Sequence, residues 1–366
     1  MEIDLDKIFH NTQVLVDRLS RIGIGVIGVT KSFLGKPQIA EMMVRAGVIG
    51  LGDSRIENIE TMRSAGMTGS MTLLRSPMLS QVPRVVASAD VSFNTEMTII
   101  RALSVAAQTI NCTHGIVLML ESGDLREGIM SCDLEATVAE VLRLPHLKLL
   151  GIGTNLACSN GVMPDDENMG ELSRCVETLE AKFGLPMARV SGGNSASLDW
   201  AFHTMARWHI NELRLGESLL LGCEPLQRTP IAGLYTDAIT LVAEVIESKV
   251  KPSLPWGTLG QSAFGEVGPV KDCGDRVQSI LALGHQDTDP WGLTAPAGLE
   301  IIGASSDHLI VDSGSCSNLV GQELTFQLNY SALLRAMTSP FVKKVMNENV
   351  NQGLGKDKYS ACDPAR

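Results

Sequence analysis

The stretch RIGIGVIGVTKSFLGKP, residues 21–37, decides between two interpretations of the whole chain. From Gly23 it has the G-x-G-x-x-G spacing of a dinucleotide-binding turn, and Lys31 comes directly after its apolar run. In a dinucleotide fold the glycines lie in the turn after a strand and open a helix. Here they precede and interrupt the apolar run, and the next helical pattern begins near Pro37. The stretch therefore favours a strand that ends near Lys31 over a phosphate-binding turn.

Short apolar runs alternate with amphipathic patterns from this stretch to about Gly222. Apolar strands that alternate with helices are typical of βαβ units and a parallel sheet. The expected strands span residues 24–30, 48–52, 71–76, 89–93, 115–121, 147–154, 188–193 and 211–216. This number of strands predicts an α/β fold, a (β/α)8 TIM-type barrel over residues 10–224. A doubly wound open sheet is the alternative that the pattern leaves open.

The pattern changes after Gly222, where strand-like stretches are separated by turns rich in glycine and proline. One of them, LEIIGASSDHLIVD, is read as a strand over residues 299–312. We expect a smaller, mostly β domain over residues 225–345, joined by an N-terminal strand from residues 1–9. The polar and aperiodic segment 346–366 is expected to be a frayed tail.

Composition excludes several classes of partner. The 366 residues carry a formal net charge of −11, which argues against binding to nucleic acid or to an anionic membrane. No run of 18 apolar residues occurs, and the first residues, MEIDLDKI, do not have the pattern of a signal peptide. The eight cysteines are scattered without metal-binding spacing, so we expect free thiols, no metal site and a cytoplasmic location. A small molecule is the expected partner.

Lys31 is the reactive residue that the sequence itself indicates. It lies at the expected carboxyl end of the first strand, and in α/β barrels this end carries the catalytic groups. Burial among apolar strands generally lowers the pKa of an amine, and a neutral amine forms a Schiff base with an aldehyde. Taken alone, however, a surface lysine at a strand end is the simpler interpretation.

The segment GVTKSFLG around Lys31 resembles the lysine-bearing strand of the alanine racemase-type barrel, the pyridoxal phosphate enzymes of fold type III. Five more segments resemble this family in the same order, so that the resemblance covers residues 2–345. They are LMLESGDLREG, GIGTNLAC, VSGGNSASLDW, NELRLGESLLLG and GASSDHLIVD. The run SFLGKP after the lysine, Asn155 where alanine racemases have a histidine, and the segments GDSRIEN and LALGHQD are more similar to the ornithine racemase branch.

The resemblance implies a role for each matched residue. Lys31 holds pyridoxal 5'-phosphate as a Schiff base and then serves as the base on one face of the substrate Cα atom. Arg214 contacts the pyridine nitrogen, and Arg126 contacts the phenolic oxygen of the cofactor or the substrate carboxylate. A surface ion pair with Asp124 or Glu127 is the alternative for Arg126. The other implied cofactor contacts are Asn155 and a phosphate loop of Gly193, Asn194 and Ser195. The other implied substrate contacts are Ser306 and Asp307.

Racemisation needs a second acid or base on the opposite face of the substrate. In the resembled family this group is a tyrosine from the β domain of the partner subunit, which implies a homodimer with shared sites. The matching stretch here, LALGHQDTDP, has no tyrosine, and His285 takes its place. An imidazole titrates near neutrality and is suited to this task. Tyr330, His308 and Cys316 remain open as other candidates for the second base.

The resemblance therefore implies an isomerase, an amino-acid racemase for ornithine or another basic amino acid. Asp53 or Glu57 could hold the distal ammonium group, although an ordinary helix start explains both residues as well. The alternatives are a racemase of alanine, serine or lysine or of broad specificity, and a pyridoxal phosphate carrier without turnover. A D-amino-acid aldolase or dehydratase, with His308 and Cys316 as metal ligands, also stays open.

Overall fold

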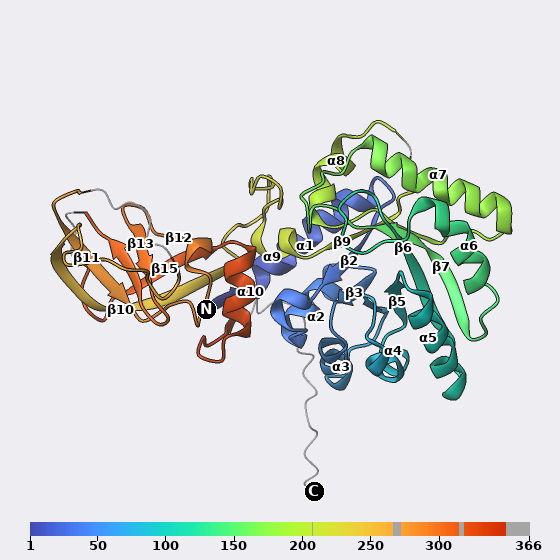
Figure 1. Ribbon diagram of the computed structural model, residues 1–366, viewed down its shortest axis with the longest axis horizontal. Helices are drawn as coiled ribbons and strands as arrows, with labels where there is room; N and C mark the ends of the chain where they lie inside the picture. Colours follow the sequence, from blue (N-terminus) through green and yellow to red (C-terminus); the bar gives the residue numbers. More distant parts are fainter. Residues whose placement is uncertain (207, 266–271, 315–317, 349–366) are drawn as a thin grey trace, which may run out of the picture.

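The computed structural model describes residues 1–206, 208–265, 272–314 and 318–348, and it contains a barrel and a β domain (Figure 1). Parallel strands close the barrel in chain order, so the expected fold class is confirmed and the open sheet is excluded. Each expected apolar run overlaps one barrel strand. These are β2 (Gly25–Val29), β3 (Gly50–Asp53), β4 (Met71–Leu73), β5 (Val91–Asn94), β6 (His114–Leu120), β7 (Leu147–Thr154), β8 (Arg189–Ser191) and β9 (Glu212–Leu215). Of these, β3, β5 and β6 each extend one residue beyond the expected run. β2 pairs with both β3 and β9, which closes the ring.

Helices cover the outside of the barrel. They are α1 (Leu5–Ser20), α2 (Pro37–Arg45), α3 (Ile56–Ser64), α4 (Val82–Ser88), α5 (Met97–Thr109), α6 (Ser131–Val141), α7 (Asp166–Phe183), α8 (Leu198–His203) and α9 (Glu217–Leu221), with the 3-10 turns η1 (Lys31–Phe33), η2 (Leu79–Gln81) and η3 (Ser195–Ser197). In α7 the local sequence sets both bounds, because Asp165 forms a capping box at the start and Gly184 ends the helix at φ 62°. Within the described ranges, no helix has the length and apolar character needed to cross a bilayer.

Gly28 of the first strand serves helix packing, and the three glycines of this stretch do not form a phosphate-binding turn. Gly23 lies in the turn before β2, whereas Gly25 and Gly28 lie within the strand. A Cβ atom on Gly28 would lie 3.0 Å from the Sδ atom of Met43 in α2, so a glycine lets this helix pack closely on the strand. Lys31 follows the strand in η1, at the carboxyl end of the barrel. The dinucleotide interpretation is therefore wrong.

The interior of the barrel combines an apolar layer with a buried polar network. The apolar layer consists of Val91, Phe93, Val117 and Met119. In the network, Nη2 of Arg189 lies 2.6 Å from Oε2 of Glu212, whose side chain is 2% exposed. The hydroxyl of Ser191 donates to Oε1 of Glu212 at 2.8 Å. Because Ser191 also accepts a hydrogen bond from Arg214, the network continues toward the mouth of the barrel.

The β domain is a sheet with one helix on its barrel side (Figure 1). Its elements are β10 (Ile239–Pro252), β11 (Asp275–Leu281), η4 (Pro290–Gly292), β12 (Leu293–Thr294), β13 (Glu300–Ala304), β14 (Leu309–Asp312), β15 (Glu323–Leu328) and α10 (Tyr330–Thr338). The single strand expected over residues 299–312 is wrong, because the backbone N–H of Ser305 donates to the carbonyl of His308 and turns the chain into a hairpin of β13 and β14. Helix α10 was not predicted; it contacts η1 and brings Tyr330 to the barrel mouth.

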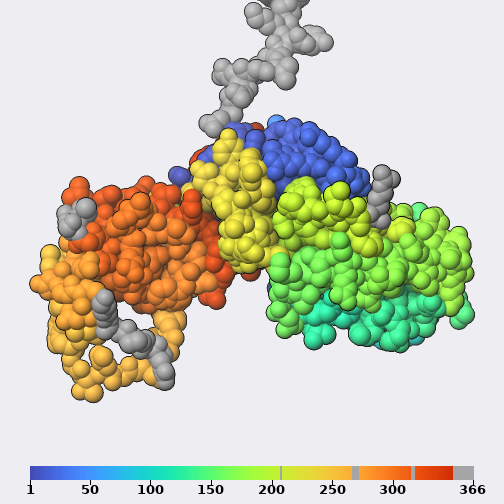
Figure 2. Space-filling view, turned by 90° about the horizontal axis from the view of Figure 1, so that it is seen from above, coloured from blue at the N-terminus to red at the C-terminus, as the bar shows by residue number. Residues whose placement is uncertain are grey.

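The N-terminal strand links the β domain to the barrel. β1 (Glu2–Asp4) pairs antiparallel with β10 and parallel with β16 (Val345–Asn347). This strand is shorter than the expected span 1–9, because the side chain of Asp4 accepts from the backbone N–H of Lys7 and caps α1 at once. β16 takes up the start of the expected tail, and the rest of that tail, 349–366, lies outside the described residues. Figure 2 shows the yellow segment after α9 between the two bodies.

His114 at the start of β6 makes the stability of the barrel depend on pH. It is 1% exposed, and its Nε2 atom lies 2.8 Å from Oγ of Ser92. Burial lowers the pKa of His114 from 6.5 to about 4, although a hydrogen bond with the backbone of Ala89 opposes the shift. Between these values the unfolded chain binds a proton that the folded chain does not bind. The contribution of neutral His114 to the free energy of unfolding is therefore complete above about pH 6.5, and it is lost as the pH falls toward about 4.

Between pH 7 and about pH 4.5, we predict that the free energy of unfolding falls by about 2 to 3 kcal/mol less in His114→Gln than in wild type, since glutamine takes up no proton. Chemical denaturation followed by circular dichroism at both pH values measures this difference. His203→Gln is the matched control, because it removes a histidine side chain that is 76% exposed, and it should keep the wild-type dependence. The same pH dependence in wild type and His114→Gln would contradict the assignment.

Candidate active site

A cavity of about 540 Å³ lies at the carboxyl end of the barrel. Its walls are mainly residues that directly follow the barrel strands. They are Val29, Lys31, Ser32, Ser54, Leu74, Arg75, Met119, Arg126, Glu127, Asn155, Ala157, Cys158, Asn194, Ser195, Arg214, Gly216, Glu217, Pro225, Arg228 and Tyr330. The cavity therefore brings together six residues that the sequence predicted for the site, namely Lys31, Arg126, Asn155, Asn194, Ser195 and Arg214.

Lys31 lies near the buried carboxyl group of Asp53. Asp53 at the end of β3 is 0% exposed, and its oxygens accept hydrogen bonds from Thr30 Oγ1 at 2.6 Å and from Asn58 Nδ2 at 3.0 Å. The backbone N–H of Arg55 donates to it at 2.9 Å. Burial raises the pKa of Asp53, while these hydrogen bonds and the nearby Lys31 charge oppose the shift. Asp53 thus joins Thr30, which precedes Lys31, to the segment that follows β3, and its role is to hold these segments together.

Neither Asp53 nor Glu57 is placed to hold a distal ammonium group in the cavity. Glu57 instead accepts hydrogen bonds from Gln81 Nε2 at 3.0 Å and from Arg84 Nη1 at 2.9 Å, and its carboxylate lies between α3 and α4. Of the two interpretations that the sequence left open, the ammonium site is therefore wrong, and Glu57 belongs to an ordinary helix start. Helix α3 carries Glu57 away from the cavity, and the donors around Asp53 engage its oxygens.

Arg214 on β9 is held deep in the cavity by neutral acceptors. It is 4% exposed, and its Nη1 atom donates to Ser191 Oγ at 2.5 Å. Its Nη2 atom donates to the carbonyl of Thr154 at 2.8 Å and to Asn155 Oδ1 at 3.2 Å. Burial lowers the pKa of Arg214 to about 10, and the Glu212 carboxylate opposes the shift. The guanidinium therefore stays charged at neutral pH.

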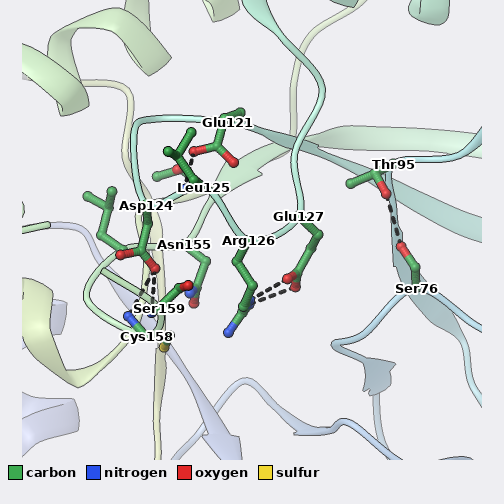
Figure 3. A network of polar contacts seen from close by, with 12 residues as sticks. Ser76, Thr95, Glu121, Asp124, Leu125, Arg126, Glu127, Asn155, Cys158 and Ser159 are labelled. Atoms are coloured by element: carbon green, nitrogen blue, oxygen red, sulfur yellow. Dashed lines mark hydrogen bonds and ion pairs between the residues drawn. The ribbon is translucent and has the colours of Figure 1, made fainter. Parts of the chain in front are cut away.

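Arg126 lines the cavity with part of its guanidinium already engaged. Its Nε atom bonds to Oε2 of Glu127, and its Nη2 atom donates to Oε1 at 2.6 Å (Figure 3). Asp124, the other residue considered as its partner, turns away and accepts from the backbone N–H groups of Cys158 at 3.0 Å and Ser159 at 2.9 Å. The pairing of Arg126 with Glu127 that the sequence left as an alternative therefore exists within the cavity wall.

The loop after β8 is fixed to its neighbours on both sides. Gly193 has φ 113°, and a Cβ atom there would lie 2.5 Å from Ser197 Oγ, so the position favours glycine. Asn194 caps η3 by accepting from the backbone N–H of Ala196 at 2.8 Å. Ser195 Oγ lies 3.0 Å from Ser218 Oγ, which joins the loop to the segment after β9.

Three predicted residues lie together in the β domain and do not line the cavity of their own chain. The backbone N–H of His285 donates to the carbonyl of Ser305 at 3.0 Å, and the next N–H donates to the carbonyl of Ser306 at 2.9 Å. Gly284 allows this contact, because a Cβ atom there would lie 2.4 Å from the backbone nitrogen of Asp307. His285, Ser306 and Asp307 therefore form one surface, which we call the His285 turn pair.

The other candidates for the second base have different positions. Tyr330 lines the cavity, and Lys31 Nζ lies 6.0 Å from the centre of its ring. Burial raises the pKa of Tyr330, and the Glu217 charge adds to the shift. His308 is exposed and its Nδ1 atom lies 2.8 Å from Asp307 Oδ1. Cys316 lies outside the described residues, so the structure does not describe its pairing with His308 as metal ligands.

Sequence reasoning missed four charged residues of the cavity wall. Arg75 lies two residues beyond β4, and Glu127 was considered only as a surface partner of Arg126. Glu217 begins α9 and forms an ion pair with Arg228 from the following segment. A position just after a strand was the available signal for Arg75 and Glu217, whereas nothing in the sequence pattern places Arg228 near them.

Comparisons with known proteins agree with this geometry. The family model "Alanine racemase, N-terminal domain" matches residues 3–225. The chain is 38% identical to the ornithine racemase of Acetoanaerobium sticklandii, over 93% of this chain and 98% of that protein. It is 37% identical to the lysine racemase of Thermotoga maritima, over 95% and 98% respectively. The crystal structure of the alanine racemase from Streptomyces lavendulae has the same fold, with a TM-score of 0.74 at 19% identity over 94% of this chain and 96% of that one. The chain therefore belongs to the alanine racemase family of pyridoxal phosphate enzymes, on the branch of the ornithine and lysine racemases.

Proposed function

We propose that this chain interconverts the enantiomers of a basic amino acid, ornithine or lysine, by moving the Cα proton between two protein groups. Family membership makes it a pyridoxal phosphate-dependent amino-acid racemase and hence an isomerase. The observation that carries the proposal is the position of Lys31 at the end of β2, in one cavity with Arg214 and the loop after β8. The names of the two relatives, an ornithine racemase and a lysine racemase, support a basic substrate.

The groups of the cavity wall suit pyridoxal phosphate. The Nδ2 atom of Asn155 is buried and has no hydrogen-bond partner among the described residues, so a cofactor oxygen would satisfy it. Gly193 lets an anion approach the backbone closely, and the side chains of Asn194 and Ser195 lie in the cavity wall beside it. We assign Asn155 to a ring oxygen of the cofactor, and Gly193, Asn194 and Ser195 to its phosphate.

Lys31 and Arg214 divide the work on the cofactor. When bound, pyridoxal phosphate supplies an electron sink for the charge that proton removal leaves on the substrate Cα. Lys31 would hold the cofactor, and its amine would take the Cα proton from one face of the substrate. Arg214 would donate to the ring nitrogen and keep it unprotonated, since an arginine does not release its proton at neutral pH. This limits the sink and favours return of the proton to Cα.

The opposite face of the substrate needs a group from elsewhere. We assign this role to His285, which lies outside the cavity of its own chain, and we infer that it enters the cavity of a partner subunit. The active form is then a homodimer in which each β domain completes the other barrel. Tyr330 is the alternative within the same chain, but burial raises its pKa and so keeps the phenol protonated, and a protonated phenol is not ready to take the Cα proton.

The remaining assignments concern the substrate. We assign Arg126 to the phenolic oxygen of the cofactor or to the substrate carboxylate, with Nη1 as the available donor, since Nε and Nη2 bond to Glu127. Ser306 and Asp307 of the His285 turn pair would contact the substrate from the partner subunit. We keep the cytoplasm as the proposed compartment, and the free state of the described cysteines supports it.

Other functions have less support. A cofactor carrier without turnover needs only a barrel, whereas this chain has a further sheet built on β10. The crystal structure of a D-threonine aldolase from Filomicrobium marinum has a TM-score of 0.70 at 18% identity, which shows a shared fold alone. A racemase of alanine, serine or broad specificity remains the second candidate, and a panel of L-amino acids followed by chiral analysis of the products separates it from the first.

Lys31 is predicted to be the residue that carries the cofactor. The purified protein should be yellow, and borohydride reduction should leave the cofactor on the peptide that contains Lys31, as mass spectrometry of a digest would show. Lys31→Ala should abolish racemisation, whereas Lys36→Ala, the matched change at the start of α2, should retain both colour and activity. Reduction that labels another lysine would refute this assignment.

His285→Ala should slow racemisation in both directions by roughly 10² to 10⁴-fold, because a positioned acid or base contributes about this much. Lys31 serves only one face, so the variant should still exchange the Cα proton of one enantiomer with solvent. The measurement is deuterium wash-in at Cα for each enantiomer separately, in wild type and variant.

The same measurement on Tyr330→Phe and His308→Ala provides the comparison. If His285→Ala racemises within a few-fold of wild type, or if both enantiomers lose exchange equally, His285 is not the second base. The residue whose variant exchanges the Cα proton of only one enantiomer would then be assigned as the second base.

A further inference from the structure

The carboxylates of the cavity wall are already paired. Glu127 is bound by Nε and Nη2 of Arg126, and Glu217 forms an ion pair with Arg228. Each pair contributes no net charge to the cavity. A substrate carboxylate that binds there needs a cation that these carboxylates leave unpaired.

Three cationic side chains of the described wall remain: Lys31, Arg214 and Arg75. Lys31 anchors the cofactor, and three neutral oxygens engage Arg214 deep in the barrel. Arg75 is half-buried, and in the described part of the chain it has no ion-pair or hydrogen-bond partner. Its planar fork of donors is thus the free bidentate anion site of the cavity.

The position of Arg75 separates it from the phosphate loop. In the closed ring, β8 and β9 lie on one side of β2, and β3 and β4 lie on the other. Gly193, Asn194 and Ser195 follow β8, whereas Arg75 lies two residues beyond β4. The neighbouring Ser76 bonds to Thr95 at 3.3 Å, which holds this segment against the end of β5 (Figure 3). Arg75 therefore meets an anion on the side of Lys31 that is remote from the cofactor phosphate.

We propose that Arg75 binds the α-carboxylate of the amino-acid substrate, an assignment that rests on the proposed racemase function. Glu127 holds the Nε and Nη2 edge of Arg126, and we assign the remaining Nη1 group to the phenolic oxygen of the cofactor. A carboxylate held bidentately by Arg75 fixes the Cα atom at a second point besides the amine. This orients the Cα proton toward one of the two bases.

The test compares Arg75→Gln, Arg75→Lys and Arg55→Gln as purified holoproteins. Arg55 carries the same charge at the same end of the barrel, but its side chain is exposed and does not line the cavity. The first readout is KM and kcat for the amino acid that the wild type racemises. The second is the binding of 1,4-diaminobutane, an amine without a carboxylate, followed by the change in cofactor absorbance.

We expect Arg75→Gln to raise KM by about 10- to 100-fold with a much smaller effect on kcat, since it loses a charge-assisted pair. Arg75→Lys should lie between Arg75→Gln and wild type, because it keeps the charge and loses the fork. Binding of 1,4-diaminobutane should be unchanged in both variants. Arg55→Gln should match the wild type in every readout.

A KM for Arg75→Gln within about threefold of wild type would overturn the assignment, as would an equal weakening of 1,4-diaminobutane binding. An unchanged cofactor spectrum and circular dichroism would show that the variants fold. If the wild type racemises no amino acid, the proposed function fails, and the absorbance change on binding L-ornithine still tests Arg75 by the same comparison. The two failures are therefore distinct.

Discussion

The buried guanidinium of Arg214 is the constraint on which the rest of the site depends. A cation in the interior of a barrel needs acceptors, and here the hydroxyl of Ser191, the carbonyl of Thr154 and the amide oxygen of Asn155 supply them. Glu212, in turn bound to Arg189, adds a negative charge one layer deeper. Because this network fixes both Arg214 and Asn155, it also fixes where a flat cofactor ring could lie relative to Lys31.

The second constraint is the attachment of the β domain. β1 adds to β10 and β16, and Asp4 at its end caps α1 of the barrel, so one short segment serves both bodies. Helix α10 contacts η1 and brings Tyr330 next to Lys31. The same arrangement leaves the His285 turn pair outside the cavity of its own chain. Under the proposed racemase function, the group for the second face of the substrate comes from a second copy of the chain, with Tyr330 as the alternative within the same chain.

The sequence could predict what depends on local pattern. Each apolar run became a barrel strand, and the position of Lys31 followed from the order of glycines and the apolar run around it. Features that depend on contacts between distant segments could not be read in this way. The sequence of helix α10 was read as part of a mostly β domain. Arg228 meets Glu217 only because the segment between them folds back. For Glu57 the sequence left a site and an ordinary helix start open, and only the contact with Arg84 of α4 decides for the helix start.

The hypothesis that one chain holds only part of the catalytic site can be tested with hybrid dimers. Lys31→Ala and His285→Ala chains carrying different tags would be co-expressed, and the hybrid would be isolated on both tags. If each site takes Lys31 from one chain and His285 from the other, the hybrid has one intact site, and its racemase activity should be about half that of the wild type although both parents are nearly inactive. A hybrid that stays as inactive as its parents, with its cofactor bound, would contradict the shared site.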